Sequence, residues 1–370
     1  MAISFTVTVI LLGSMIAQGI FAAALLGFAR TNVIANRLLA CLVLSFSVWL
    51  LDGLFQLGGV YQQDPNFYFL PIFYSLGLGP LLYLYVRSLT TTSATVGLRH
   101  AWHFIPVLLQ ASLYLFLTSK PYAYRSWFWF EVHAPFTYGL EFYLTVASLM
   151  VYGLASVRRI QRFQEWLREN YSEFSRIRLQ WLKVVVGLLL VLCLLWCADV
   201  MLRESSRVFH WESANALFMG GIVLVLSVGG LRQQAMGNVD FVPPTETDTP
   251  TKITLDADLL NRIKEEMREQ AFFRQPELTL KQFARELGLP PRQVSQYLNQ
   301  GLEQSFVDFV NSHRVAYLQE RLADGALDRF TLLAIALESG FNSKSSFNRA
   351  FKRFTGITPT AYLKAENLEG

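Results

Sequence analysis

Long runs of apolar residues, separated by short polar segments, fill the chain up to residue 231. A helix that crosses the hydrocarbon core of a bilayer needs roughly 20 mostly apolar residues. Seven runs come close to this length, so the pattern predicts seven membrane-spanning helices. They cover residues 5–28, 38–60, 67–89, 101–118, 134–157, 180–202 and 211–231.

The pattern changes after the last of these runs. Residues 237–254 mix Pro, Thr and acidic residues without apolar periodicity, which is typical of a linker. From Asp256 onward, apolar residues recur at the spacing of amphipathic helices. We therefore predict an all-α protein with a seven-helix transmembrane domain at 1–236, a linker at 237–254 and a soluble all-helical domain at 255–370.

One pattern occurs twice in the soluble domain. Residues 280–299 and 332–352 each place an Ala four positions before a Gly: Ala284 with Gly288, and Ala336 with Gly340. The small Ala allows two helices to approach closely, and the Gly supplies the backbone freedom of a tight turn. The repeat predicts two helix-turn-helix units, each of which ends in a short helix.

These two short helices each have one apolar stripe and one polar face. Val294 and Leu298 form the first stripe, and Phe347 and Phe351 form the second. Arg, Lys, Asn and Gln on the free faces are the side chains that read base edges in the major groove of DNA. The polar positions are Arg292, Ser295, Gln296 and Asn299 in the first helix, and Lys344, Ser345, Asn348 and Arg349 in the second.

At these residues the chain resembles the DNA-binding domain of AraC-type transcription regulators. The resemblance rests on GFNSKSSFNRAFKRFTGITPTAY at 340–362 and SFVDFVNSHRVAYLQERL at 305–322. It implies two helix-turn-helix units joined by a long helix. The base-edge contacts that it implies fall on Arg292, Ser295 and Gln296 in the first unit and on Lys344, Ser345 and Arg349 in the second. It further implies phosphate contacts from residues such as Lys352 and Arg353. A departure is Pro290-Pro291 at the start of the first of these helices, a position where Pro is tolerated.

Composition and charge refine this picture. Apolar residues make up 52% of the chain and charged residues only 16%, which agrees with a large lipid-embedded part. Residues 255–370 contain 15 basic and 15 acidic residues, so their net charge gives no argument for DNA binding. Residues 339–365, however, contain five basic residues and no acidic one, which predicts a local positive face for phosphate attraction.

The loops between the predicted spans indicate the orientation of the chain. Those assigned to one side carry twelve Lys or Arg residues, and the opposite set carries four. Because basic residues in short loops favour the cytoplasmic side, we expect an outer N-terminus and a cytoplasmic C-terminal domain. The expected location is the inner membrane of a bacterial cell.

Three acidic residues fall within predicted spans: Asp52, Glu141 and Asp199. Ionisable groups at such positions are costly and indicate function. One hypothesis is an acidic pocket between spans two, five and six that senses a cation, an amine or protons. The alternative is that each acid is separately paired, hydrated or hydrogen-bonded for packing reasons.

Other membrane segments leave alternatives open. The aromatic residues of 122–136 favour an interfacial belt over a ligand-capping lid, and the glycines near Pro80 favour a kink or packing notch over a binding site. The basic amphipathic segment 157–178 is either a surface helix or a contact for the DNA-binding domain. The three cysteines are expected to be apolar packing residues, so we expect no metal site and no cofactor.

The sequence as a whole predicts a one-component signal transducer that couples an outer or intramembrane stimulus to promoter binding; it does not distinguish an activator from a repressor. The alternatives are a constitutive membrane-anchored regulator, or a transporter or enzyme with a regulatory tail, although no catalytic motif supports an enzyme. The expected partners are double-stranded DNA, the lipid bilayer and a small-molecule or ionic stimulus. RNA polymerase and a second copy of the chain are further candidates.

Overall fold

A computed structural model describes residues 5–64, 67, 70–91, 98–172, 179–205, 212–233 and 255–369. The chain divides into two compact units. The first unit contains Met1–Gln161 and Leu179–Val242, and the second contains Arg162–Arg178 and Pro243–Gly370. The described residues are helical or irregular, with one isolated antiparallel bridge between Tyr171 and Thr279. This confirms the predicted all-α class; the linker at 237–254 lies outside the described residues.

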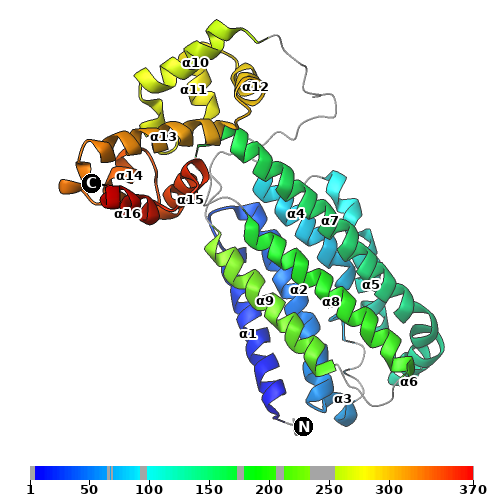
Figure 1. Ribbon diagram of the computed structural model, residues 1–370. Coiled ribbons are helices and arrows are strands. Elements are labelled where there is room, and N and C mark those ends of the chain that lie inside the picture. Colours follow the sequence, from blue (N-terminus) through cyan, green and yellow to red (C-terminus); the bar gives the residue numbers. More distant parts are fainter. Residues whose placement is uncertain are drawn as a thin grey trace. The chain divides into compact units, whose positions relative to one another are not determined.

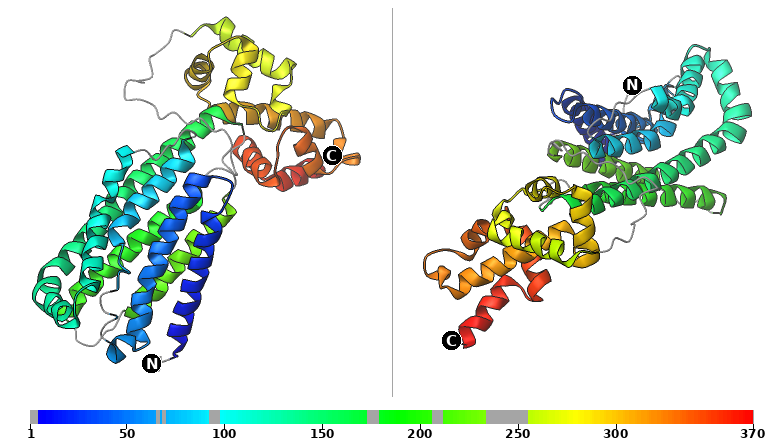
Figure 2. Two further views of the ribbon diagram at one scale, coloured as in Figure 1. Left: turned by 180° about the vertical axis from the view of Figure 1, so that it is seen from behind. Right: turned by 90° about the horizontal axis from the view of Figure 1, so that it is seen from above.

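The first unit is a bundle built mainly of long helices (Figure 1). Helices α1, α2 and α9 contact one another, α2 also contacts α4, and α9 also contacts α8. Figure 2 shows these helices side by side from two further directions. The α-helices that begin in this unit are α1 (Val7–Gly27), α2 (Val33–Leu57), α3 (Val60–Gln63), α4 (Leu78–Thr90), α5 (Ile105–Thr118), α6 (Tyr122–Phe128), α7 (Tyr138–Asn170), α8 (Gln180–Ser205) and α9 (Glu212–Arg232).

Three other helical segments complete the first unit. The 3-10 helices η2 (Ser75–Gly77) and η3 (Leu98–Phe104) precede α4 and α5. The π-helix η4 (Trp129–Thr137) joins α6 to α7. It contains Pro135, which has no N–H to donate to a helical hydrogen bond. Because π-helical segments are rare and often occur at functional sites, the residues of η4 are candidates for a functional site.

Helices of membrane-spanning length are abundant in the described part of the chain. Six are long and apolar enough to cross a bilayer: Val7–Gly27, Val33–Leu57, His100–Thr118, Tyr122–Asn170, Gln180–Ala198 and Ser213–Arg232. Large apolar side chains on them face outward, and Leu109, Val151 and Leu194 are 68%, 65% and 69% exposed. Apolar surface of this kind fits a lipid environment better than water.

The predicted third span, residues 67–89, differs from the other predicted spans. Its regular α-helix is only α4, 13 residues long, and residues 70–74 are not helical. Ten residues of α4 are buried, so this helix lies inside the bundle. Non-helical backbone at membrane depth is tolerated where protein covers it or where it lines a cavity. The seven-span count therefore stays a prediction.

The glycines near Pro80 form a packing notch, as expected. A Cβ at Gly79 would lie 2.6 Å from Ser148 Oγ and 2.9 Å from Tyr152 Cδ2, both on α7. Only a glycine permits this approach without a shift of α7. The notch explains how the short α4 packs closely inside the bundle.

The second unit contains the predicted DNA-binding domain. Its α-helices, apart from the C-terminal end of α7, are α10 (Ala257–Glu269), α11 (Leu280–Leu287), α12 (Pro291–Gly301), α13 (Phe306–Ala323), α14 (Leu332–Glu338), α15 (Lys344–Thr355) and α16 (Pro359–Glu369). Two 3-10 turns, η6 (Phe272–Arg274) and η7 (Ala326–Asp328), connect them. The long helix α13 joins the two helix-turn-helix units α11–α12 and α14–α15.

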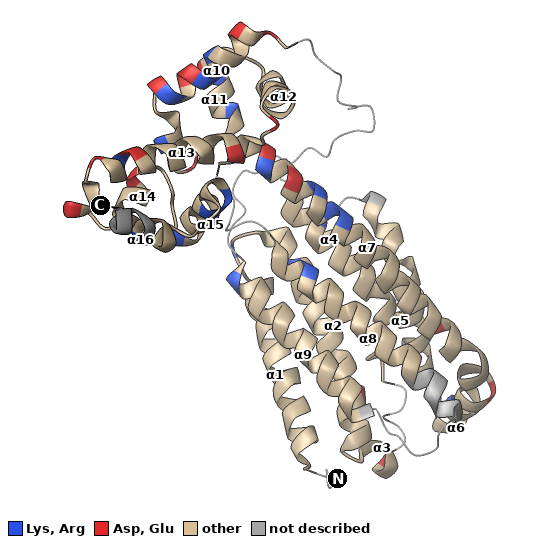
Figure 3. Cartoon of the chain, viewed as in Figure 1, with Lys and Arg blue, Asp and Glu red and all other residues tan. Residues whose placement is uncertain are grey.

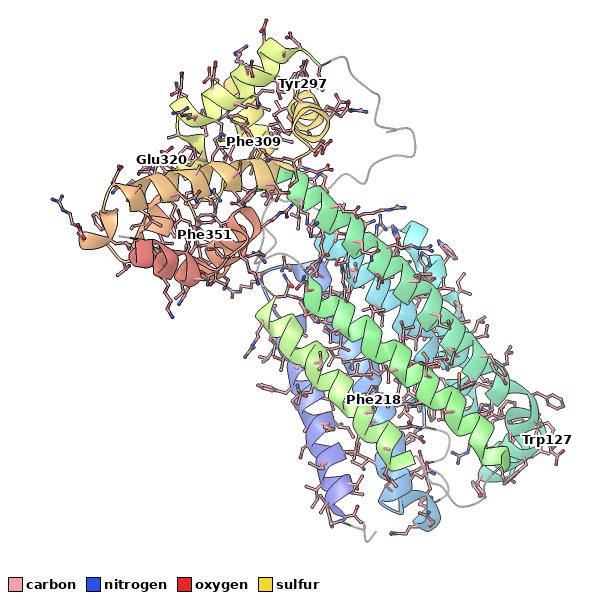
Figure 4. The ribbon with its side chains drawn as sticks, viewed as in Figure 1. Trp127, Phe218, Tyr297, Phe309, Glu320 and Phe351 are labelled. Carbon is pink, nitrogen blue, oxygen red and sulfur yellow. The ribbon has the colours of Figure 1, made fainter. Side chains whose placement is uncertain are left out.

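Two hydrophobic cores hold this unit together, and α13 contributes to both. Phe306, Phe309 and Val310 belong to the core of the first helix-turn-helix unit. Val315 and Leu318, further along α13, belong to the core of the second. Figure 4 labels Tyr297 and Phe309 in the first core and Phe351 in the second. Because one helix serves both cores, the two units are held in a defined register.

The helix ends in this unit are set by local sequence. Thr279 and Gln282 form a capping box at the start of α11. Ser305, Thr331 and Ser343 each accept a backbone N–H bond at the start of α13, α14 and α15. Each such cap satisfies a donor that the first helical turn leaves free. Helices α11, α13, α14 and α15 therefore begin at positions that the local sequence favours.

Candidate DNA-binding interface and bundle cavity

The first helix-turn-helix unit presents the polar face that the sequence predicts. Val294 and Leu298 are fully buried, and Ala284 on α11 is fully buried beside them in the same core. Gly288, between α11 and α12, has a φ of 70° and caps α11. Arg292 and Asn299 are exposed, and Ser295 and Gln296 are half-buried. Pro291 occupies the first position of α12, where it costs no helical hydrogen bond.

The second unit repeats this arrangement. Phe347 and Phe351 are buried in the core, with ring centroids 5.7 Å apart. Lys344, Ser345, Asn348 and Arg349 are all exposed on the opposite face of α15. Lys352 and Arg353 follow in the last turn, and Figure 3 shows the basic residues of this helix. The exposed face thus combines the side chains predicted to contact bases with positive charge.

Arg353 has a structural partner in addition to its predicted role at phosphate. Its Nη2 lies 2.7 Å from Asp308 Oδ2 on α13, and Asp308 is also hydrogen-bonded to Ser305. The Arg353 side chain is 61% exposed, so the ion pair does not remove it from the surface. The contact ties α15 to α13 and so helps to orient α15.

A buried arginine lies at the centre of the domain. Arg314, on α13 between the segments that serve the two cores, has no exposed surface. Its Nε and Nη2 donate to the carbonyl oxygens of Phe273 and Gln275, each at 2.7 Å, and its guanidinium lies 5.6 Å from the centroid of the Phe341 ring. Arg314 thereby links α13 to η6 and to the turn of the second unit.

Glu338, at the end of α14, makes a second link across the domain. It accepts a hydrogen bond from Tyr317 at 3.0 Å and pairs with Arg274 and Arg321, each at 3.5 Å. Arg274 follows Phe273 of the first core, whereas Glu338 precedes the turn of the second helix-turn-helix unit. These contacts support the register that α13 sets.

The C-terminal end of α7 belongs to the same unit as the DNA-binding domain. Ser172 donates its N–H to the carbonyl of Leu278 at 3.0 Å, and its hydroxyl accepts from Arg314 Nη2 at 3.3 Å. Tyr171 and Thr279 form the isolated bridge. Of the two readings of segment 157–178, these contacts favour the element that touches the DNA-binding domain. Residues 173–178 lie outside the described part.

The first unit contains a partly open cavity of about 810 Å³. Helices α2, α5, α7, α8 and α9 contribute to its wall, together with η2 and η4. Asp52 from α2 and Glu141 from α7 both line it, which brings together two of the three predicted acids. Asp199 lies on α8, but its side chain is outside the described residues. Trp196, three positions earlier on α8, lines the cavity.

Each of the two carboxylates is held by a tyrosine. Tyr61 donates its hydroxyl to Asp52 Oδ1 at 2.6 Å, and Tyr114 donates to Glu141 Oε2 at 3.1 Å. Gln110 Nε2 lies 3.5 Å from the same oxygen of Glu141 and 3.2 Å from Ser75 Oγ. These bonds orient both acids in the cavity wall.

The aromatic segment 122–136 contributes to this cavity as well. Tyr122, Trp129 and His133 line it, and His133 is buried with its Nδ1 2.7 Å from Thr137 Oγ1. The Trp129 and His133 ring centroids are 4.9 Å apart. Part of the segment therefore lines the cavity, whereas the sequence alone favoured an interfacial belt over a ligand-capping lid.

Several of these residues carry no signal that sequence reasoning can use. Arg314 occupies a helix whose other charged residues are solvent-exposed or half-buried, and Ser172 belongs to a segment without a motif. The tyrosines and Gln110 at the acids are ordinary residues of apolar helices. A polar residue in such a helix is the one available indication, because it needs a partner.

Comparisons with known proteins support the C-terminal assignment. A family model described as a helix-turn-helix domain matches residues 283–365. The match confirms the AraC-type helix-turn-helix region predicted from the sequence, and such a domain is a DNA-binding regulator module rather than an enzyme. Neither the curated proteins nor the solved structures gave a match to the chain. The C-terminal end of the chain is thus an AraC-type helix-turn-helix domain.

Proposed function

We propose that the chain is a membrane-integrated, sequence-specific transcription regulator. The observation that carries this proposal is the presence, in one chain, of the matched helix-turn-helix domain and, among the described residues, six apolar helices of spanning length. The domains are those expected from the sequence, with residues 1–236 in the inner membrane and residues 255–370 in the cytoplasm. The regulator binds promoters while it remains anchored in the bilayer.

Sequence is read by the exposed faces of α12 and α15. Two recognition helices in one domain enter successive turns of the major groove, about 34 Å apart along the DNA. Lys352 and Arg353 bind phosphate, which supplies affinity without sequence information. The base-edge contacts come from Arg292, Ser295, Gln296, Lys344, Ser345, Asn348 and Arg349.

The chain also acts as a one-component signal transducer, and the cavity with Asp52 and Glu141 is its sensing site, together with Asp199. Helix α7 supports this part of the proposal. It carries Glu141 at the cavity, and the residues that follow its C-terminal end include Ser172, which contacts Leu278 and Arg314. A stimulus that shifts α7 changes a contact of the DNA-binding domain directly.

The test is selection of genomic DNA fragments by the full-length protein in lipid nanodiscs. A side chain that reads a base in bidentate fashion contributes about 1 to 3 kcal/mol of discrimination. Arg349→Ala should therefore weaken binding to the selected sites by roughly 5- to 150-fold and relax the preference at one position. The matched control is Arg329→Ala, which removes an exposed arginine outside both recognition helices.

A salt series separates base reading from phosphate binding. Lys352→Ala should weaken binding about equally at all sequences and reduce the slope of log affinity against log salt by about one. The proposal is wrong if the wild-type protein shows no sequence preference, or if Arg349→Ala and Arg329→Ala bind the selected sites equally well.

A further inference from the structure

Three segments of the first unit bring basic side chains together. The residues, which we call the basic cluster, are Arg87 in the last turn of α4, His100 and His103 in η3, and Arg159 on α7. Arg87 is close enough to His103 and to Arg159 for its charge to act on both. The ring centroids of His100 and His103 are 6.4 Å apart. The cluster therefore joins α4, η3 and α7 through like-charged or neutral groups.

The segments that form the cluster contain no acidic residue to balance it. Residues 65–130 include α4 and η3, and residues 142–164 include the part of α7 around Arg159; neither range has an Asp or Glu. The guanidinium of Arg87 makes no hydrogen bond or ion pair with the residues that the structure describes. An arginine side chain stays charged at any ordinary pH. The charge of Arg87 thus favours an anion from outside the protein.

Hydrogen bonds hold the cluster in place. Arg159 donates from Nε to Thr90 Oγ1 and from Nη2 to Thr91 Oγ1, each at 2.6 Å, which ties α7 to the end of α4. The Nδ1 of His103 lies 2.6 Å from the hydroxyl of Tyr152, which ties η3 to α7. When the tyrosine donates this bond, Nε2 of His103 keeps its proton and can donate to a ligand.

His100 adds an independent observation. Its Nδ1 is buried and has no hydrogen-bond partner in the described part of the chain. Buried polar atoms nearly always have a partner, so an atom without one indicates a water, ion or ligand that completes the site. An imidazole beside Arg87 and His103 suits an anion with several acceptor oxygens.

Trp102 indicates the depth of the cluster in the membrane. Its ring stacks on that of His103, with centroids 4.0 Å apart, and its side chain is 61% exposed. Tryptophan is enriched at the level of the lipid headgroups. Leu108 and Leu109, further along in α5, are exposed as well and suit the hydrocarbon region. The cluster therefore fits the boundary at which lipid phosphates lie.

From these observations we propose that the basic cluster binds the headgroup phosphate of an anionic phospholipid. Arg87 donates to the phosphate, the charge of Arg159 adds to the attraction, and the two imidazoles complete the set of donors. Basic sites between spanning helices on the cytoplasmic side suit such headgroups. A lipid bound here contacts α4, η3 and α7 together and braces the short α4 against α7. The inference rests on the membrane part of the proposed function, and on neither sensing nor DNA reading.

The test compares lipids added to the full-length protein in a neutral detergent. The probes are dioleoyl phosphatidylglycerol, dioleoyl phosphatidylcholine and, as phosphates without acyl chains, inorganic phosphate and glycerol 3-phosphate. Binding is followed as a saturable rise in the unfolding temperature, because a ligand that binds only the folded state stabilises it. Phosphatidylglycerol should bind roughly five-fold or more tightly than phosphatidylcholine, and the two soluble phosphates should have no effect at millimolar concentration.

Three variants connect that binding to the cluster. Arg87→Gln removes a charge and should weaken the binding of phosphatidylglycerol roughly five-fold or more, whereas Arg87→Lys keeps the charge and should retain most of the binding. The matched control is Arg30→Gln, an exposed arginine outside the three segments. It should leave binding unchanged, because a neutral detergent presents no charged lipid surface. The unfolding temperature without added lipid shows that each variant is folded.

The outcomes separate the site from the proposed function. Equal binding of phosphatidylglycerol and phosphatidylcholine overturns the inference, and so does equal binding of phosphatidylglycerol by wild type and Arg87→Gln. An equal loss in Arg30→Gln and Arg87→Gln also overturns it, because the lipid then responds to net charge alone. If inorganic phosphate or glycerol 3-phosphate stabilises the protein as phosphatidylglycerol does, the ligand is a soluble phosphate and the lipid is wrong. Recovery of the protein from cells in the soluble fraction without detergent contradicts the membrane part of the proposed function instead.

Discussion

Arg314 shows how one side chain determines the geometry of the DNA-binding domain. It is the largest fully buried residue described, and its two short bonds end on the backbone carbonyls of Phe273, in η6, and Gln275, which follows η6. The residue therefore stabilises the junction between the two helix-turn-helix units, not the exposed faces of α12 and α15.

Replacement of Arg314 by Met tests this role. Arg314→Met keeps an unbranched apolar stem but leaves buried acceptors unsatisfied, so we expect a loss of about 2 to 5 kcal/mol in the free energy of unfolding. Urea denaturation of residues 252–370, followed by circular dichroism, measures it, since both cores lie within this fragment. Arg329→Met, at an exposed position, is the control and should cost less than about 0.5 kcal/mol.

His313 makes the stability of this domain depend on pH. Burial lowers the pKa of His313 below its ordinary value of 6.5, and the charge of Arg268 lowers it further, while a hydrogen bond to the Phe309 carbonyl opposes both. Below pH 6.5 the unfolded chain binds a proton that the folded domain does not. The free energy of unfolding should thus fall as the pH drops from 7 toward 5.

His313 is the one histidine in residues 255–370, so His313→Gln should remove most of the slope between pH 7 and pH 6 in the same urea assay. An unchanged slope in the variant would show that other groups cause it.

Sequence reasoning predicted which side of α12 and α15 is buried, but not the buried contacts that support these helices. The spacing of Val294, Leu298, Phe347 and Phe351 indicates which side of each helix is buried, because a helix repeats every 3.6 residues. Burial confirms all four. The buried Arg314 has no such signature, since an arginine in an amphipathic helix usually faces water. Its partners are backbone carbonyls, which no pattern of residue types reveals.

At the scale of elements, the two turns of the helix-turn-helix units differ. Gly288 and Gly340 have φ angles of 70° and 97°, so each needs the conformational freedom of glycine. A Cβ at Gly288 would meet open space, whereas a Cβ at Gly340 would collide with the carbonyl of Phe273 and with the backbone of Arg274. The second turn is therefore a packed junction, and the first is not.

Alanine at these two positions should have unequal effects. Gly288→Ala should cost about 1 to 2 kcal/mol, the penalty of a left-handed conformation. Gly340→Ala should cost at least about 2 kcal/mol more, because backbone atoms must shift. Urea denaturation of residues 252–370 compares them directly. Equal losses would mean that the second turn adjusts freely.

Helices α4 and α7 show where hydropathy fails to give element lengths. Hydropathy detects residues 67–89 as one run because it averages over a window, but only Leu78–Thr90 is α-helical. It cannot distinguish a helix that faces lipid from one that other helices cover. Conversely, α7 continues to Asn170, beyond the apolar run 134–157 that hydropathy detects, because its last turns belong to the second unit.

At the scale of the whole molecule, the topology of the proposed regulator depends on α4. If α4 crosses the bilayer, Asp64 and Thr91 lie on opposite sides, and the chain has seven spans. We expect alkaline phosphatase fused after Asp64 or Ser119 to be active, and green fluorescent protein fused after Thr91 or Gly370 to fluoresce. The same reporter active after both Asp64 and Thr91 would reduce the count to six and contradict the proposed orientation of one terminus.

The unit that contains the DNA-binding domain is discontinuous in sequence, and this affects its biosynthesis. Ser172 contacts Arg314, which follows 142 residues later, and helices α8 and α9 lie between them in the chain. At roughly 5 to 20 residues per second, the ribosome takes roughly 7 to 28 s to make that stretch. Ser172 must wait through the insertion of two membrane helices before its partner exists. A ribosome that stalls after α9 would leave a membrane-inserted intermediate with this surface unpaired and open to chaperones or proteases.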